Sequence, residues 1–403
     1  MIIRAEPGGI MFFIPCTGRR GIIAGKELEK LLHWLETGKE NFFTDRLSHL
    51  HIMPYLKDRK KILKEEIERS YNIKSPPASF AVPESLHIDL TSRCLLNCSQ
   101  CYRDRTAGID MDFNFLKNIL KEAEKINIFQ IAFGGGEPLL YPRLVEAVSA
   151  VNSYGMSSTV TTGGAGLNKD YLQNLMDAGI NHIQISLNGS TPEINSRSRD
   201  GYKEAIEALS LLKSQKLSYG INWTARRDNL EDFPSMIYLS QQYRVKNINI
   251  LRLKPDRKGS FKEQILSPSE FIRLGEYIKK YSLKGPVIKI DSSFSSLLCW
   301  IYSDISLPAG CGAGRYFMSV DVYGNFRACS HMTYGEKYDT IIDYWHESAF
   351  LNKLRIPEDM GEPCSTCLNL NKCRGCRVIC KDLYGDFYGG ETGCPAYKSF
   401  IER

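Results

Sequence analysis

The chain has 403 residues, which is enough for a large α/β barrel with one or two smaller units. Its hydrophobic content of 43% and charged content of 24% are those of a globular protein and allow a sizeable core. The net charge of +6 is far below the charge of a typical nucleic-acid-binding protein, so we expect no nucleic-acid partner.

The apolar start of the chain does not have the pattern of a signal peptide. Gly8 and Gly9 interrupt it, and no cleavage site follows. No apolar run approaches the roughly 20 residues of a membrane-spanning helix. We therefore expect a cytoplasmic protein without a membrane partner.

The first 80 residues form a separate predicted unit of α+β type. Strands are expected near residues 10–15 and 18–25, and a helix over 26–38. A basic stretch at 56–70 follows, and the proline- and serine-rich residues 75–85 read as a linker.

Residues 84–290 alternate between strand-like and helix-like segments. Such alternation predicts a parallel sheet with right-handed crossovers. Because about six strands are visible, fewer than the eight of a closed barrel, we expect an open, partial (β/α)6 barrel with its chemistry at the carboxyl ends of the strands. The predicted strands span 85–91, 129–135, 157–162, 182–188, 219–225 and 245–253, and the predicted helices span 111–126, 142–155, 169–179, 201–215, 232–243 and 267–281.

Thirteen cysteines are unusual for a cytoplasmic protein, where disulfides are rare and metal ligation is the main alternative. Three lie between residues 94 and 101, and nine lie between 299 and 394. Cys16 stands apart and is expected to be a small buried apolar residue. The last hundred residues, 295–403, have little helical periodicity, as expected where metal ligands replace an apolar core.

Cys94, Cys98 and Cys101 follow the first barrel strand. Three thiolates can hold three irons of a four-iron cluster and leave the fourth iron open. A zinc site is the alternative, but zinc usually takes four ligands from paired C-x2-C motifs, which this spacing fits poorly.

A glycine-rich turn, FGGGEP at residues 133–138, follows the second strand. Its glycines, Gly135 and Gly136 among them, allow main-chain atoms to approach a ligand closely. Glu137 offers a carboxylate to an ammonium group. A tight βα connection would explain such a turn equally well if the cysteine triplet did not precede it on the same rim.

With this triplet and the Gly-Gly-Glu turn, the sequence resembles the radical SAM superfamily over about half of the chain. The resemblance implies a [4Fe–4S] cluster whose open iron binds S-adenosylmethionine through its amino and carboxylate groups. One-electron cleavage then gives methionine and a 5′-deoxyadenosyl radical, which takes a hydrogen atom from the substrate. A flavodoxin or ferredoxin is the expected electron donor. Gln100 departs from the family, which often has an aromatic residue before the third cysteine.

Later strand ends should supply further contacts to S-adenosylmethionine. Ser186 and Asn188 are expected to reach the ribose or carboxylate, and Arg199 to pair with the carboxylate. Leu251 and Leu253 are expected to pack on the adenine. Strand-end capping, a surface arginine and core leucines are the structural alternatives.

The C-terminal cysteines resemble the SPASM extension of radical SAM enzymes, which implies two auxiliary iron–sulfur clusters. By that resemblance, one cluster takes Cys364, Cys367, Cys373 and Cys394, and the other begins with Cys311 and Cys329. The family usually has C-x3-C after the position of Cys373, whereas this chain has Cys376 and Cys380, so either one or both are candidate ligands of the other cluster. Cys299 is a third candidate, or a hydrogen-atom donor to the substrate. Zinc ribbons are the alternative.

The resemblance leaves the substrate open. A ribosomally made peptide is the first hypothesis, because such enzymes often carry an N-terminal winged-helix-like unit that grips a leader peptide as an added strand. Oxidation of a sulfatase residue is the second, although Ser330 stands where an aspartate is usual. A tetrapyrrole or other small molecule is the third, and a non-enzymatic zinc scaffold is the fourth.

Overall fold

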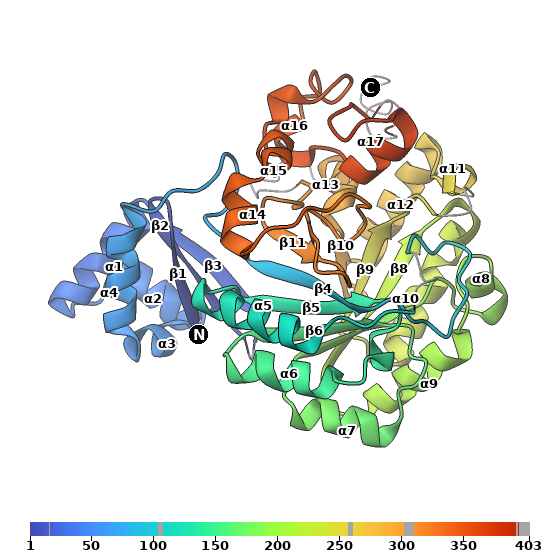
Figure 1. Cartoon of the computed structure of the whole chain (residues 1–403), viewed down its shortest axis with the longest axis horizontal. Coiled ribbons are helices and arrows are strands. Elements are labelled where there is room, and N and C mark those ends of the chain that lie inside the picture. The colour runs from blue at the N-terminus through green and yellow to red at the C-terminus, as the bar shows by residue number, and fades with distance from the viewer. Residues whose placement is uncertain (16, 104–107, 257–260, 302–309, 392–393, 395–403) are drawn as a thin grey trace.

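The computed structural model describes the chain except for residues 16, 104–107, 257–260, 302–309, 392, 393 and 395–403, so Cys16 lies outside the described residues. An N-terminal lobe, a central barrel and a cysteine-rich C-terminal region follow one another along the chain (Figure 1). No helix in the described part is both long and apolar enough to cross a membrane.

The N-terminal lobe is a three-stranded antiparallel sheet, in the order β1-β2-β3, covered by four helices. The sequence predicts two strands and one helix for this lobe, and the structure has one more strand and three more helices. Trp34, Leu31 and Leu63 are buried between sheet and helices, so this lobe has its own core. Its elements are β1 (Ile2–Glu6), β2 (Gly9–Ile14), β3 (Arg19–Ala24), α1 (Lys26–Thr37), α2 (Phe42–His49), α3 (Met53–Lys57) and α4 (Lys60–Ser70).

The barrel is a nine-stranded sheet in the order β10-β9-β8-β7-β6-β5-β4-β11-β12. All neighbours from β10 to β11 pair in parallel, and only β12 runs antiparallel. The strands are β4 (Ser85–Thr91), β5 (Gln130–Gly135), β6 (Ser157–Thr162), β7 (His182–Ser186), β8 (Ser218–Ala225), β9 (Asn247–Arg252), β10 (Val287–Ile290), β11 (Phe317–Val320) and β12 (Phe326–Arg327).

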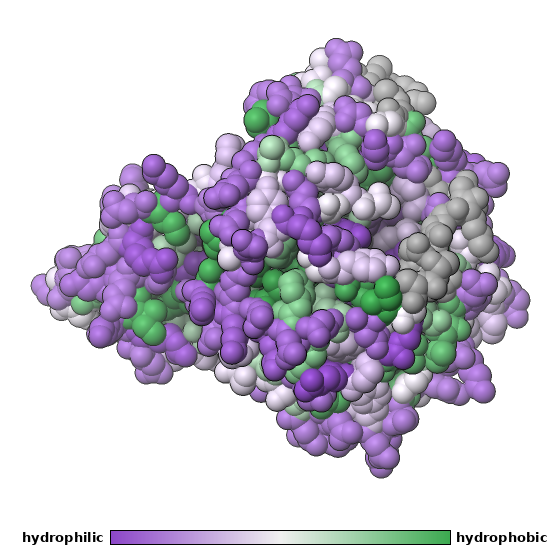
Figure 2. Space-filling view, viewed as in Figure 1, coloured by the Kyte–Doolittle hydropathy of each residue, from purple (hydrophilic) through white to green (hydrophobic). Residues whose placement is uncertain are grey.

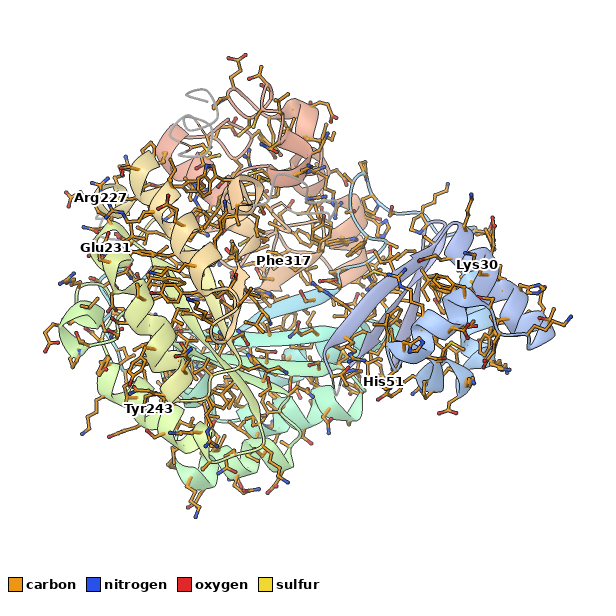
Figure 3. The ribbon with its side chains drawn as sticks, turned by 180° about the vertical axis from the view of Figure 1, so that it is seen from behind. Lys30, His51, Arg227, Glu231, Tyr243 and Phe317 are labelled. Carbon is orange, nitrogen blue, oxygen red and sulfur yellow. The ribbon has the colours of Figure 1, made fainter. Side chains whose placement is uncertain are left out.

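The predicted open α/β barrel is confirmed, with one strand more than expected. The sequence predicts six parallel barrel strands, and β10 is a seventh. It was missed because it has only four residues and lies at the sheet edge beside β9, with Val287 exposed. The C-terminal region then extends the sheet at the opposite edge, where Phe317 of β11 pairs with Ser85 of β4. Figure 3 shows Phe317 inside the molecule at this junction, far from Lys30 and His51 in the N-terminal lobe.

Helices cover the outer face of the barrel, as Figure 1 shows for α6, α7 and α9. The predicted helix over 111–126 is α5, and its N-cap Asp112 accepts a hydrogen bond from the Phe115 N–H at 2.8 Å, as the sequence indicates. The helical elements of the barrel are α5 (Phe113–Lys125), η1 (Pro138–Leu140), α6 (Leu144–Ser153), α7 (Lys169–Asp177), α8 (Pro192–Ser196), α9 (Tyr202–Lys213), η2 (Arg227–Asp232), α10 (Phe233–Gln242), α11 (Phe261–Gln264), α12 (Pro268–Tyr281), η3 (Ser292–Phe294) and α13 (Ser295–Ile301).

The C-terminal region is more helical than its sequence suggests. Short helices surround a real apolar core, in which Tyr344, Trp345 and Leu351 are buried, and this core escaped the prediction because its helices have only four to eight residues. These elements are α14 (Ile341–Glu347), α15 (Ala349–Leu354), η4 (Pro357–Asp359), α16 (Leu370–Cys373) and α17 (Arg377–Tyr384).

The predicted linker packs firmly against the C-terminal region. Ala81 and Val82 are buried, and the Phe80 carbonyl accepts a hydrogen bond from the Trp345 indole at 2.9 Å. The N-terminal lobe also contacts the barrel directly, since the Phe13 and Phe129 rings stack with centroids 5.3 Å apart. Hydrophilic side chains cover most of the lobe on the face that Figure 2 shows.

Candidate active site

A cavity of about 890 Å³ occupies the inside of the barrel. Its wall is formed by alternate residues of β4 to β9, such as His87, Gln184 and Asn249, which face inward because successive strand residues point to opposite sides of the sheet. The loop that follows β4 closes the cavity at the carboxyl ends of the strands. At the other end Thr17 and Gly18 of the turn between β2 and β3 line it, together with Arg20 of β3.

The three cysteines after β4 all line this cavity. Cys98 is buried, and Cys94 and Cys101 are half-buried. The loop is anchored to the segment after α8 by two backbone contacts. The Gln100 N–H donates to the Ser198 carbonyl at 3.2 Å, and the Asn97 N–H donates to Asp200 Oδ2 at 2.8 Å.

The glycine-rich turn after β5 packs directly against the start of the cysteine loop. The Gly136 and Glu137 N–H groups donate to the Thr91 and Arg93 carbonyls at 2.6 and 2.7 Å. A Cβ atom on Gly136 would lie 2.1 Å from the Arg93 oxygen, and one on Gly135 would lie 2.4 Å from the Thr91 oxygen. These two glycines are therefore required for a close approach of two loops within the chain.

The Glu137 carboxylate is buried and bonded within the protein. It accepts hydrogen bonds from the Thr162 hydroxyl at 2.6 Å, the Gly163 N–H at 2.8 Å and the Leu139 N–H at 3.2 Å. Burial raises the pKa of Glu137, and these bonds oppose that effect. The carboxylate fixes the turn after β5 to the end of β6, and both segments line the cavity.

Four of the five expected contacts to S-adenosylmethionine face the cavity, namely Ser186, Arg199, Leu251 and Leu253. Asn188 is placed differently. Its side chain donates to Ser198 Oγ at 2.9 Å and accepts from the Thr224 N–H at 3.0 Å, and it does not line the cavity. Within the described structure its carboxamide joins the ends of β7 and β8.

The residues around the cysteine loop suit a cluster and a charged ligand. No three Cys, His, Asp or Glu side chains of the described chain converge on a position for one metal ion, and a cluster does not need them to, because each thiolate binds a different iron. Arg199 lines the cavity beside the loop, and its buried Nε has no partner among the described residues. An arginine with a free donor here suits a carboxylate.

A second, smaller cavity gathers cysteines of the C-terminal region. Cys364, Cys367, Cys373 and Cys394 all line it, which is the set expected for one auxiliary cluster. Cys299, on α13, lines the same cavity, so the structure brings it to this group instead of to the other one. Burial raises the pKa of Cys373, and the neighbouring Cys394 thiol raises it further.

Cys311, Cys329 and Cys376 form the other group. Burial raises the pKa of Cys329 to about 12, and the thiols of Cys311 and Cys376 contribute to this shift, as they do only where groups lie close together. Cys380 lies one turn further along α17, where burial raises the pKa of its thiol. The charge of Arg377 opposes this shift, and Glu391 and the thiols of Cys376 and Cys364 add to it. Cys376 is thus the better candidate for the third ligand of this group.

Several residues of the site were not recognised from the sequence. Lys254 is buried at the cavity wall, with its Nζ 3.7 Å from Asp291 Oδ2. Asp89 of β4 pairs with Arg103 at the same wall. Only Asp89 carried a signal, because polar residues at alternate positions of a barrel strand point into the barrel, and this signal requires the strand register to be known.

The chain is similar in sequence to several known proteins. Residues 88–237 match the sequence model of the Radical SAM superfamily. A PqqA peptide cyclase of Bradyrhizobium diazoefficiens is 25% identical over 358 residues, which cover 82% of this chain and 91% of that protein. The mycofactocin maturase MftC of Mycobacterium tuberculosis is 26% identical, covering 75% of this chain and 80% of its own. An AdoMet-dependent heme synthase of Methanosarcina barkeri is 21% identical, with coverages of 77% and 96%.

The fold is similar to that of Streptococcus suis SuiB. The structure of SuiB bound to S-adenosylmethionine has a TM-score of 0.74 and 15% identity, and the likeness covers 98% of both chains. The structure of SuiB bound to its precursor peptide SuiA has a TM-score of 0.73 and 14% identity, with the same coverages. A likeness this complete extends beyond the barrel to the N-terminal lobe and the cysteine-rich region.

Proposed function

We propose that this chain, which contains a radical SAM domain over residues 88–237, is an enzyme that modifies a ribosomally made peptide by radical chemistry. The observation that carries the proposal is the meeting of Cys94, Cys98, Cys101 and the turn containing Glu137 at one cavity inside a partial barrel. A metal-binding scaffold would not require a cavity of this size beside three thiols.

The three thiols are proposed to hold a [4Fe–4S] cluster and to leave one iron open. When bound, this group and S-adenosylmethionine supply a one-electron cleavage that yields methionine and a 5′-deoxyadenosyl radical able to take hydrogen from a substrate. A flavodoxin or ferredoxin is proposed as the electron donor.

The chain's own residues orient the reactants. Arg199 suits the carboxylate of S-adenosylmethionine, since its Nε is buried without a partner in the described chain. Ser186 offers a hydroxyl at the end of β7, and Leu251 and Leu253 offer an apolar wall for the adenine. Glu137 acts through position, because it holds the turn that supports the cysteine loop.

Two auxiliary iron–sulfur clusters are proposed for the C-terminal region. One would take the four cysteines of the second cavity, and the other would take Cys311, Cys329 and Cys376. Without a cluster, these groups of three and four thiols, which are buried or half-buried, would have no binding role.

A peptide is the proposed substrate because of two independent observations. The relatives include a peptide cyclase and a peptide-bound enzyme of the same fold. In addition, β3 is an edge strand, which pairs with β2 alone among the described strands, so its other edge is available to an added strand of a leader peptide.

The experiment is incubation of the reduced, anaerobic enzyme with S-adenosylmethionine and each short peptide encoded beside its gene. The proposal predicts a mass change in one peptide, with one molecule of 5′-deoxyadenosine released for each hydrogen atom removed. A tetrapyrrole or a sulfatase converted in place of every peptide would refute the peptide part of the proposal while leaving the radical part intact.

A further inference from the structure

The inside of this barrel is polar where closed α/β barrels are filled with bulky apolar side chains. Below the level of Ser186, the inward positions of β5 to β9 are mostly amides, hydroxyls and a histidine. Among the residues that line the cavity here are Gln130, Thr159, His182, Gln184, Asn222 and Asn249. The space is therefore built to hold a polar group.

The amides are joined in a directed chain of hydrogen bonds. Asn247 Nδ2 donates to Asn249 Oδ1 at 2.8 Å, and Asn249 Nδ2 donates to Asn222 Oδ1 at 2.9 Å. His182 Nε2 lies 2.6 Å from Gln184 Oε1 and donates to it, because an amide oxygen can only accept. The amide oxygens of Asn222, Asn249 and Gln184 are thus already acceptors within the protein.

The hydrogen-bonding capacity that remains consists of donors. Gln184 is 3% exposed and lines the cavity, and its Nε2 has no partner among the described residues. Gly220 makes room for this arrangement, because a Cβ atom there would lie 2.5 Å from Gln184 Oε1 and 2.6 Å from Asn247 Nδ2. A buried donor without a partner costs free energy unless a ligand satisfies it.

The charged residues that line the cavity also favour an anionic ligand. Seven lysine and arginine side chains line it, against three carboxylates. Lys246 directly precedes β9, and Lys289 lies on β10 beside Asn249 of β9. Both side chains line the cavity near Arg20 of the N-terminal lobe, are partly exposed to solvent, and form no ion pair with a described residue. Burial lowers the pKa of Lys289, and the positive charges of Lys246 and Arg20 lower it further, which an anion bound between them would relieve.

We infer that this polar part of the cavity is a subsite for a carboxylate group of the substrate, bound by Lys246 and Lys289 and by the free Gln184 amide. The inference rests on the proposed function in taking the substrate to be a peptide. Gln184 precedes Ser186 by two residues, about 7 Å along β7, whereas Lys289 is level with Ser186 through the register of β8, β9 and β10. Either an acidic side chain of the peptide or its terminal carboxylate has the required chemistry.

The test is a binding titration with the full-length, cluster-loaded protein and no reductant, so that it does not depend on the radical reaction. Three rhodamine-labelled decapeptides of Gly and Ser are compared by fluorescence anisotropy. The first has a central Glu and an amidated end, the second has Gln and an amidated end, and the third has Gln and a free terminal carboxylate. We expect the first or the third to bind at least about tenfold more tightly than the second, an effect typical of a charged hydrogen-bond partner.

Two double variants test whether the preference for a carboxylate depends on the lysines of the cavity. In the double variant K246Q/K289Q the preference should fall below about threefold, whereas K216Q/K284Q, which removes two exposed lysines outside the cavity, should retain it. Tighter binding of the first peptide would identify the ligand of the subsite as a side-chain carboxylate. Tighter binding of the third peptide would identify it as a terminal carboxylate. Equal binding of all three, no binding of any, or a preference that survives K246Q/K289Q would overturn the inference. Loss of S-adenosylmethionine cleavage with the preference intact would count against the proposed function alone.

Discussion

Arg252 at the end of β9 and Glu391 in the C-terminal region form an ion pair in which both side chains are buried, with Arg252 Nη1 3.0 Å from Glu391 Oε2. Glu391 also contacts both groups of cysteines. Glu391 Oε2 accepts a hydrogen bond from the Cys376 N–H at 3.4 Å, and the Glu391 N–H lies 3.3 Å from Cys364 Sγ. This one residue thus joins the barrel to the two candidate cluster sites.

Replacing Glu391 by glutamine should destabilise the protein strongly. The change leaves the buried Arg252 guanidinium without its counter-ion, and breaking one partner of a buried pair costs about 3–5 kcal/mol. Urea unfolding of the anaerobic protein measures the loss. Asp382→Asn, an exposed change on α17, is the control and should stay within about 0.5 kcal/mol of the parent. Equal unfolding midpoints for E391Q and the parent would contradict the role of the ion pair.

The stability difference between the parent and E391Q should not depend on pH above the usual carboxyl range. Burial raises the pKa of Glu391, but the charge and hydrogen bonds of Arg252 and the Cys376 N–H lower it more, so the pKa lies below its ordinary value of 4.5. The stabilisation from a lowered pKa is complete above 4.5 and is lost as the pH falls through the folded-state value. Unfolding at about pH 8 and about pH 5.5 should give the same difference. A difference that already shrinks over this interval would show that another group is responsible.

Gly136→Ala should weaken the first cluster site while leaving the auxiliary sites intact. The added methyl group would lie 2.1 Å from the Arg93 carbonyl oxygen, so the cysteine loop must move. Iron analysis after anaerobic reconstitution should show about four irons fewer per chain than in the parent. Gly134→Ala is the neighbouring control, because its methyl group would come no closer than 3.9 Å to another heavy atom within the described chain. Full iron content in G136A, or equal losses in both variants, would refute this steric explanation.

Cys376 and Cys380 should differ in their importance for iron. Cys376 lies with Cys311 and Cys329, so Cys376→Ala should lower the iron and sulfide content by up to about four atoms each. Cys380→Ala removes a buried thiol one helical turn away and should leave both contents unchanged. The reverse pattern would assign the ligand to Cys380 and would require α17 to be turned relative to its present orientation.

The sequence was sufficient for the parts of this structure that depend on local pattern. The repeated change between strand and helix periods predicted the barrel. The family resemblance implied most of the cysteines that line the two cavities, whereas Cys299 was expected elsewhere. The four-residue β10 was too short to show a period. Asn188 is of a residue type that suits a ligand contact, but its side-chain amide forms hydrogen bonds that connect the ends of β7 and β8.

Features that depend on distant contacts could not be predicted in this way. Glu391 and Arg252 are separated by 139 residues, and nothing local to either indicates the other. Gly135 and Gly136 line the cavity, where a ligand contact is expected, but the sequence did not show that they also admit the cysteine loop. The polar barrel interior was visible as alternation in segments such as 182–186, but only the folded sheet shows that the polar side faces inward.

The central claim is that Cys94, Cys98 and Cys101 form the site of S-adenosylmethionine cleavage. The most direct measurement is the release of 5′-deoxyadenosine by the reduced, anaerobic protein and by its triple alanine variant at these positions. The account predicts release by the parent and none by the variant, which should still contain the iron of the two C-terminal sites. Continued release by the triple variant, or none by the fully iron-loaded parent, would contradict it.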